Sequence, residues 1–310
     1  MLKSRIVQRF RRPVQLLVMF VITAIPWLNY YGIKISQKDD YAILDSFVLS
    51  WLHSLFSGQG RDEVIAWTHH VKGSVWTMDL WGYKISDPLA VIESTTITLY
   101  LYLPLILSLV IPVIVTVLFG KVFCGWICPM NLLLEINDKL RTLLQRTGYQ
   151  TRNILFSSAT KYYTLGLGLI AAFIAGRPLL ALIYPPAVIS RSIFYKIYND
   201  LWGAGIWIII GILFFELILS RRWWCRYICP GGAVYTALSR FRLLRIQRDD
   251  NHCDQCGDCV PVCPYDLKPM TRELTAVCDQ CGLCIAACAP DALRYTLNRT
   301  TPQVTPQEQP

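Results

Sequence analysis

Apolar positions gather in long runs along this chain rather than in the short alternations of a soluble fold. Four such runs lie near residues 13–33, 97–119, 162–183 and 203–220. Each is close to the ~20 residues that a helix needs to cross a hydrocarbon core about 30 Å thick. The third run contains Arg177 and Pro178, so we expect its helix to end near Ala175. The pattern predicts an α-helical polytopic membrane protein with four transmembrane helices.

Beyond the fourth run the pattern changes to short polar stretches. Residues 237–252 set arginines among apolar residues, which is typical of a segment that lies on an anionic membrane surface. Residues 253–299 are compact, polar and rich in cysteine, and residues 300–310 have the Pro, Gln and Thr content of a disordered tail. We therefore expect a membrane domain over 1–236, a basic juxtamembrane linker, a small α+β domain and a tail.

Composition and charge agree with a membrane protein. The chain has 310 residues, of which 54% are hydrophobic, and this content is too high for an ordinary soluble enzyme. A net charge of +9 would suggest nucleic-acid binding in a soluble protein. Here the basic residues are sorted by loop rather than gathered on one face, so we expect no nucleic-acid partner.

The distribution of basic residues predicts the orientation. Lysine and arginine dominate before the first run and between the second and third runs, whereas acidic residues outnumber basic ones between about 34 and 95. The positive-inside rule then places both termini in the cytoplasm of a bacterial inner membrane. The basic N-terminus resembles a signal peptide, but no A-x-A-like cleavage site follows, so we expect an uncleaved anchor.

The strongest chemical signal is a pair of cysteine runs with the spacing C-x2-C-x2-C-x3-C, beginning at Cys253 and Cys278. This spacing predicts two [4Fe–4S] clusters, in which the fourth cysteine of each run ligates the cluster of the other run. Zinc sites usually use separated C-x2-C pairs instead, and disulfides suit neither this spacing nor the cytoplasm. The expected ligand sets are Cys253, Cys256, Cys259 and Cys288 for one cluster, and Cys278, Cys281, Cys284 and Cys263 for the other.

Four further cysteines belong to an internal repeat. Cys124 and Cys128 follow the second run, and Cys225 and Cys229 follow the fourth, each pair in a C-x3-C-P motif. A P-x-A-V-I stretch precedes both runs, and we expect it in an outer loop. A repeat of two spans keeps its orientation, so the four thiols should meet near an axis along the membrane normal. They could hold a metal, form a redox-active pair or dock the cluster domain, or the proline could simply end each helix.

With these motifs the sequence resembles the NapH/MauN family of membrane ferredoxin-type proteins, and is most similar to its NapH branch. The resemblance implies four spans, cytoplasmic termini and a quinol dehydrogenase component. Such a component passes electrons from the quinol pool through a periplasmic ferredoxin-type partner like NapG to a terminal reductase or c-type cytochrome, here of the nitrate reductase type. The outer segment His53–His70 is longer than this family suggests, so MauN-like or NosR-like pathways remain open.

Quinol oxidation releases protons, so the implied activity needs a proton acceptor. Glu216 is ionisable and lies in the fourth run, which makes it the candidate for this role. Its alternative role is to reach Arg221 or Arg222 at the interface. His69 and His70, beside Trp67 and Trp76, could serve an outer quinol site or a partner instead. We expect the remaining charges near the P-x-A-V-I stretches to be interfacial, with a role in the site as the alternative: Asp87, Glu93 and Arg191.

Two other classes of protein fit parts of the pattern. A membrane assembly or redox-sensing factor could carry the clusters without sustained turnover, and a zinc-stabilised scaffold could use the same thiols. The orientation also raises a question about the pathway, because every cysteine is expected on the cytoplasmic side whereas the implied acceptor is periplasmic.

Overall fold

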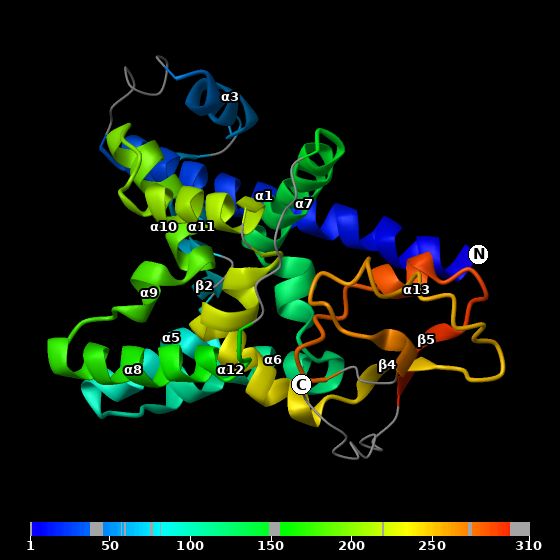
Figure 1. The fold of residues 1–310 in the computed structure, drawn as a ribbon. Helices are drawn as coiled ribbons and strands as arrows, with labels where there is room; N and C mark the ends of the chain where they lie inside the picture. Colours follow the sequence, from blue (N-terminus) through cyan, green and yellow to red (C-terminus); the bar gives the residue numbers. More distant parts are fainter. Residues whose placement is uncertain are drawn as a thin grey trace. The chain divides into compact units, whose positions relative to one another are not determined.

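Figure 1 shows a computed structural model of the chain, which is mostly helical. It describes residues 2–37, 46–56, 58, 60–74, 77–80, 82–148, 156–218, 220–271 and 275–297. The expected tail over 300–310 lies outside these residues. The chain divides into two compact units. We call Met1–Gln15, Val113–Leu165 and Leu213–Pro310 the cysteine unit, since all twelve cysteines lie in it. We call Leu16–Pro112 and Gly166–Ile212 the cysteine-free unit.

The first apolar run forms one long helix, α1 (Leu2–Ser36). Its portion Val7–Ser36 is long and apolar enough to cross a membrane. The other apolar helices of the described chain are 10–17 residues long, so the structure does not by itself establish the predicted four spans. These shorter helices are α3 (Phe47–Phe56), α6 (Leu103–Phe119), α8 (Thr160–Ala175) and α11 (Gly205–Ile218).

Breaks within the runs explain why these helices are short. In the second run, α5 (Pro88–Thr98) ends at Leu99, whose φ of 52° is left-handed, and α6 starts a few residues later. In the third run, α8 ends at Ala175 as predicted, before the Gly176 turn and the short α9 (Leu180–Ile183).

The two P-x-A-V-I stretches start helices, although we expected them in loops. They begin α5 and α10 (Pro185–Asn199), and each helix has proline in its first turn. Proline suits that position because it lacks an N–H group that would otherwise need a partner and because its φ is already helical. The Asp87 carboxylate also caps α5 by accepting a hydrogen bond from the Leu89 N–H at 2.7 Å.

The cysteine-free unit orders the long segment between the first two runs. It contains α3, α4 (Arg61–His70) and a three-stranded antiparallel sheet of β1 (Val71–Ser74), β2 (Thr77–Leu80) and β3 (Tyr83–Ser86). A small core joins α1 to α3 and α4 through buried Tyr31, Leu49 and Val64. The segment His53–His70 is therefore largely helical.

The C-terminal domain is built on a two-stranded antiparallel sheet of β4 (Leu244–Arg248) and β5 (Leu293–Leu297). Strand β4 lies within the segment that we expected to be a juxtamembrane linker, so those arginines belong to the folded domain. The 3-10 turns η3 (Ser239–Phe241) and η4 (Pro269–Thr271) and the helix α13 (Leu283–Ala287) complete it. Its core combines strand side chains with cysteines: Ile246, Cys259, Cys278, Cys284, Ile285 and Leu293.

Candidate iron–sulfur site

Each C-x3-C-P motif forms a π-helical turn followed at once by a helix. The turns are η1 (Phe123–Ile127) and η2 (Trp224–Ile228), and each closes when the second cysteine N–H bonds five residues back, to Phe123 O at 2.9 Å and to Trp224 O at 2.8 Å. The prolines then begin α7 (Pro129–Arg146) and α12 (Pro230–Leu238). Proline thus starts a new helix here rather than simply ending the previous one.

The two turns bring their four thiols together, as the repeat predicted. Cys128 and Cys229 interact electrostatically with each other, and both also act on Cys225 and on Cys124. Burial is the main influence on all of these thiols, and it raises the pKa of Cys128 to about 12. Metal ligation needs thiolates, so binding of iron at this group would release protons from the thiols.

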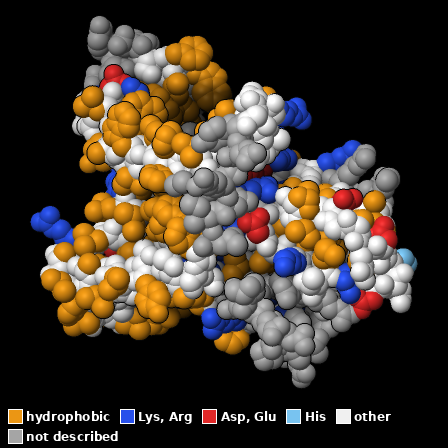
Figure 2. Space-filling model, viewed as in Figure 1, with side chains coloured by type: hydrophobic (Ala, Val, Ile, Leu, Met, Phe, Trp, Pro, Cys, Tyr) orange, Lys and Arg blue, Asp and Glu red, His pale blue; other side chains and the backbone are white. Residues whose placement is uncertain are grey.

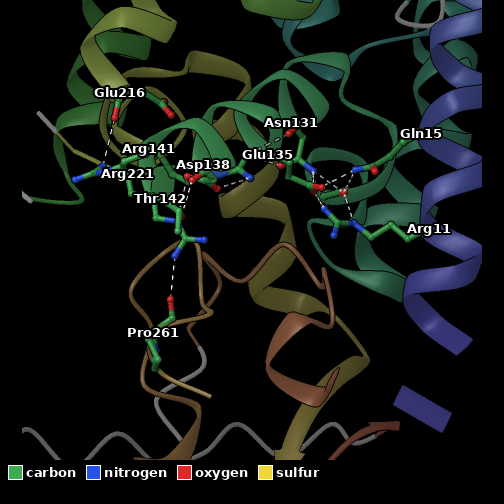
Figure 3. A network of polar contacts seen from close by, with 12 residues as sticks. Arg11, Gln15, Asn131, Glu135, Asp138, Arg141, Thr142, Glu216, Arg221 and Pro261 are labelled. Atoms are coloured by element: carbon green, nitrogen blue, oxygen red, sulfur yellow. Dashed lines mark hydrogen bonds and ion pairs between the residues drawn. The ribbon is translucent and has the colours of Figure 1, made fainter. Parts of the chain in front are cut away.

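A buried polar network holds η1 in place (Figure 3). Arg11 of α1 donates from Nε to the Gly125 carbonyl at 2.9 Å and forms an ion pair with Glu135 of α7, which Arg12 also contacts. Asn131 donates to the same carbonyl at 2.8 Å. Arg11 is 1% exposed, so this charge and its carboxylate are removed from water together.

The same network continues to the second turn. Buried Arg222 donates to the Asn131 side-chain oxygen at 2.6 Å, and Asp138 binds both Arg222 and Arg221. Arg221 also donates to the Pro261 carbonyl of the C-terminal domain at 3.0 Å, as Figure 3 shows. One set of side chains on α7 therefore links both C-x3-C turns to the cluster domain.

Glu216 lies in this region, close to the second turn. It is 3% exposed, and its carboxylate accepts a hydrogen bond from the Trp224 N–H at 3.1 Å, at the start of η2. It interacts electrostatically with Arg222 and Cys225. The side chain is therefore held inside the protein beside a cysteine, and not directed toward water at the interface.

The first cysteine run of the C-terminal domain lines an open pocket. The empty space in it is about 320 Å³, open solvent included, and the lining contains all four cysteines of the first expected ligand set, Cys253, Cys256, Cys259 and Cys288. Cys256 is exposed, and the pKa of Cys259 is raised by burial. Exposure thus varies within this set: Cys256 is exposed, Cys253 and Cys288 are half-buried, and Cys259 is buried.

The second run is buried instead. Cys278, Cys281 and Cys284 are each 7% exposed, and Cys263 of the first run acts electrostatically on Cys278 and Cys284. Burial raises the pKa of Cys278 to about 12. The second expected ligand set is therefore grouped in the protein interior.

This buried run packs directly against η1. A Cβ added to Gly125 would come within 2.4 Å of the Asp279 carbonyl oxygen, so the two backbones touch. Trp126 donates from Nε1 to the Gln280 carbonyl at 3.0 Å, and Gln8 of α1 donates to the Cys281 carbonyl at 2.7 Å. The C-x3-C-P region is thus a docking surface for the second cysteine run.

Other candidates from the sequence lie elsewhere. Asp87 and Glu93 belong to the cysteine-free unit, and both are 2% exposed rather than interfacial. Asp87 accepts from the Tyr184 hydroxyl at 2.9 Å, and Glu93 accepts from the Leu180 N–H at 2.6 Å. These bonds tie α5 to the α9–α10 segment, and Arg191 donates to the Ala181 carbonyl at 3.2 Å. The side chains of His69 and His70, and Trp76 as a whole, lie outside the described residues.

Sequence reasoning missed the residues that hold the site, namely Arg11, Asn131, Glu135, Asp138 and Asp279. A signal existed for α7, because proline is followed by apolar positions at helical spacing. Nothing local marks Asp279, since Asp254 occupies the same place in the first run. Among the described residues, no three Cys, His, Asp or Glu side chains lie close enough to hold a single metal ion.

Comparison with known proteins agrees with iron–sulfur chemistry. A family model described as a 4Fe-4S binding domain matches residues 101–147 and 201–248. Those stretches contain the two C-x3-C-P motifs and end before Cys253, so the match is independent of the C-terminal cysteine runs. No solved structure matches the chain.

The relatives include two ferredoxin-type proteins and a putative electron transport protein. NapH of Haemophilus influenzae is 34% identical over 186 residues, which cover 58% of this chain and 60% of NapH. The methylamine utilization protein MauN of Paracoccus denitrificans is 30% identical over 199 residues, covering 63% and 66%. The putative electron transport protein YccM of Escherichia coli is 29% identical over 164 residues, covering 51% and 45%. The chain thus spans about half to two thirds of the length of these relatives.

The fold and cysteine sites define an iron–sulfur protein of the electron-transfer class. Within that class the chain belongs to the NapH/MauN family of ferredoxin-type proteins.

Proposed function

We propose that this protein is a membrane-bound electron-transfer subunit that connects the quinol pool to a periplasmic reductase pathway through a NapG-like ferredoxin-type partner. The observation that carries the proposal is the direct packing of the second cysteine run on the C-x3-C-P turn. Iron–sulfur clusters, when bound, accept and release single electrons. A continuous protein contact between the two cysteine groups keeps such centres close without solvent between them.

In this proposal the eight C-terminal cysteines hold two [4Fe–4S] clusters with the crossed ligand sets. The common pocket of Cys253, Cys256, Cys259 and Cys288 supports the first set. The electrostatic grouping of Cys263 with Cys278 and Cys284 supports the second. Buried thiols in an apolar core suit a soft, thiolate-bound cluster.

We also propose that Cys124, Cys128, Cys225 and Cys229 hold a third cluster. The matched family model is described as a 4Fe-4S binding domain and covers these residues. Four thiols on two rigid turns provide a complete donor set, and buried cations near them favour thiolates. The electron route would then run between this group, the buried C-terminal run and the exposed one.

Glu216 is the proposed proton acceptor for quinol. A quinol gives up two protons with its two electrons, so a proton acceptor close to the first electron acceptor is needed. The buried Glu216 carboxylate interacts with Cys225, which places a proton-binding group beside the proposed third cluster. Its hydrogen bond from the Trp224 N–H holds the carboxylate in place at the start of η2.

Exposed apolar faces support a multi-pass membrane protein, and the distribution of basic residues supports cytoplasmic termini. Leu103, Leu107 and Ile111 follow one face of α6 and are 56–66% exposed. Figure 2 shows a similar gathering of hydrophobic side chains over α8, where Leu167, Ile170 and Ile174 are 59–79% exposed. Apolar patches of this kind suit contact with lipid.

Anaerobic purification with iron and sulfide analysis tests the proposal. Roughly twelve irons per chain are expected for three clusters, and roughly eight would restrict the clusters to the C-terminal domain. The reduced clusters should also exchange electrons with a water-soluble quinone analogue. No exchange with any quinone would contradict the electron-transfer role with quinol and favour an assembly or redox-sensing function.

A further inference from the structure

Two buried lysines near the C-x3-C-P thiols lack the anions that such burial requires. Lys121 is 0% exposed, and in the described part of the chain no hydrogen-bond acceptor reaches its ammonium group. Its contact is the Tyr265 ring, whose centroid lies 5.0 Å from Nζ. A cation over a ring gains only part of the energy that an ammonium loses on leaving water.

The second lysine has a neutral partner. Lys161 at the start of α8 is 1% exposed and donates to the Thr236 hydroxyl at 3.1 Å. A hydroxyl satisfies one hydrogen bond of the ammonium but does not neutralise its charge. Both lysines therefore bring an amine into the interior of the cysteine unit. Burial lowers the pKa of Lys161 to about 7, so a nearby anion is needed to keep it charged.

The second C-x3-C-P motif also has a buried basic residue at the equivalent position. Lys121 lies three residues before Cys124, and Arg222 lies three residues before Cys225. Both are buried, but Arg222 has the Asp138 carboxylate as its partner. The lysine of the first motif thus occupies the equivalent position without an equivalent anion.

Both lysines act on the thiols. Lys121 interacts electrostatically with Cys124, and Lys161 interacts with Cys124 and Cys229. The buried carboxylate of Asp279 also acts on Cys124. Among the described residues, however, no ion pair joins Asp279 to either lysine. The cysteine group is therefore the natural place for the missing negative charge.

We propose that Lys121 and Lys161 are the counter-charges of an anionic thiolate-bound cluster at Cys124, Cys128, Cys225 and Cys229, and that they raise its reduction potential. This inference rests on the third cluster of the proposed function. Four thiolates give such a cluster a net negative charge, which increases by one when it accepts one electron from quinol. A fixed cation in a water-poor interior stabilises the reduced form more than the oxidised form.

The test uses the full chain, purified without oxygen, with EPR-monitored redox titration of each cluster. Lys121→Met keeps the length of the side chain and removes its charge. We expect the ratio of reduced to oxidised third cluster at a fixed ambient potential to fall about tenfold, equivalent to a midpoint lower by about 59 mV. Lys161→Met should act in the same direction, and the double variant should shift further.

Matched variants separate charge from packing. Lys139→Met removes a lysine from the exposed face of α7 and should leave all midpoints unchanged. Lys121→Arg keeps the charge and should keep the midpoint near that of the original protein. If Lys121→Met loses the third cluster while Lys121→Arg retains it, the charge requirement is supported. Loss of the cluster in both variants would show a need for shape rather than charge and would overturn the inference.

The two proposals fail in different ways. Absence of a third EPR signal and roughly eight irons in the unmodified protein would remove the third cluster itself. A third cluster that is present, with the same midpoint in Lys121→Met and Lys161→Met, would overturn only the counter-charge role.

Discussion

The two cysteine runs of the C-terminal domain have almost the same sequence but different surroundings. C-D-Q-C-G-D-C begins at Cys253, and C-D-Q-C-G-L-C begins at Cys278. Their backbones also agree, since Gln255 and Gln280 both have a φ of 58°. In the first run the aspartate and glutamine are exposed, whereas Asp279 and Gln280 are each 1% exposed against η1. The local sequence thus determines the backbone conformation of the loop, whereas tertiary packing determines how exposed its side chains are.

Burial and solvent exposure are among the factors that set the potential of an iron–sulfur cluster. Asp254, Gln255 and Cys256 of the first run are open to solvent, whereas Asp279 and Gln280 of the second run lie against the C-x3-C-P turn. The comparison therefore predicts that the second run, and not the first, contacts the C-x3-C-P turn. Matched substitutions at equivalent positions of the two runs test this prediction.

The largest difference is expected from ligand substitution. Cys281→Ser should remove about four irons and lower the yield of folded protein, because a ligand is lost in the packed interior. Cys256→Ser should weaken mainly the other cluster and leave the fold intact, because Cys256 is exposed. Iron analysis, EPR and thermal melts measure both effects. Equal loss of both clusters in the two variants would contradict separate sites.

The network beneath η1 should matter next most. Glu135→Leu leaves Arg11 buried without its carboxylate, which should lower the free energy of unfolding by roughly 3–5 kcal/mol. Since Arg11 also holds the Gly125 carbonyl, the EPR signal of the buried cluster should change more than that of the exposed one. Asp200→Asn, which removes a surface partner of Lys196, is the control and should melt like the original protein. Identical melting of both variants would show that this network is dispensable.

A smaller effect is expected from adding a methyl group at the contact between η1 and the second run. Gly125→Ala places a Cβ against the Asp279 carbonyl and should cost about 1–3 kcal/mol through overpacking. Chemical labelling of the second-run cysteines in the protein stripped of iron should increase as the contact loosens. Gly211→Ala is a suitable control, because nothing lies within 4 Å of the added carbon. Unchanged labelling in Gly125→Ala would argue against close docking.

The smallest effect should come from exchanging one charge. Asp279→Asn removes a buried carboxylate near the second run and should raise the midpoint of that cluster by on the order of 50 mV, since the interaction is poorly screened. Asp254→Asn, at the equivalent exposed position, should change its cluster much less because water and salt screen it. Redox titration of both variants gives the comparison, and equal shifts would mean that burial does not control these potentials.

The local features of the site could be predicted from the sequence. The cysteine spacing predicted the ligand sets, of which the first lines one pocket, and Arg177 with Pro178 predicted the end of α8 at Ala175. The repeat predicted that the four C-x3-C-P thiols lie near one another, and they interact electrostatically. These features depend on residues close together in the chain. The π-helical turns of the C-x3-C-P motifs and the helix break at Leu99 were not predicted.

Features that depend on distant partners could not be predicted. Pro129 and Pro230 fit the end of one helix and the start of the next equally well, so the start of α7 was missed. Residues 244–248 look like a basic linker until β5 is present to pair with them. Likewise Asp87 and Glu93 look interfacial until Tyr184 and Leu180 supply their donors.

The tight fit of Gly125 against Asp279 also constrains how the protein is assembled. In the proposed loaded protein, iron and sulfide would have to reach Cys278, Cys281 and Cys284 before this contact closes, because afterwards these thiols are covered. The exposed Cys256 would leave an edge of the other cluster open to solvent.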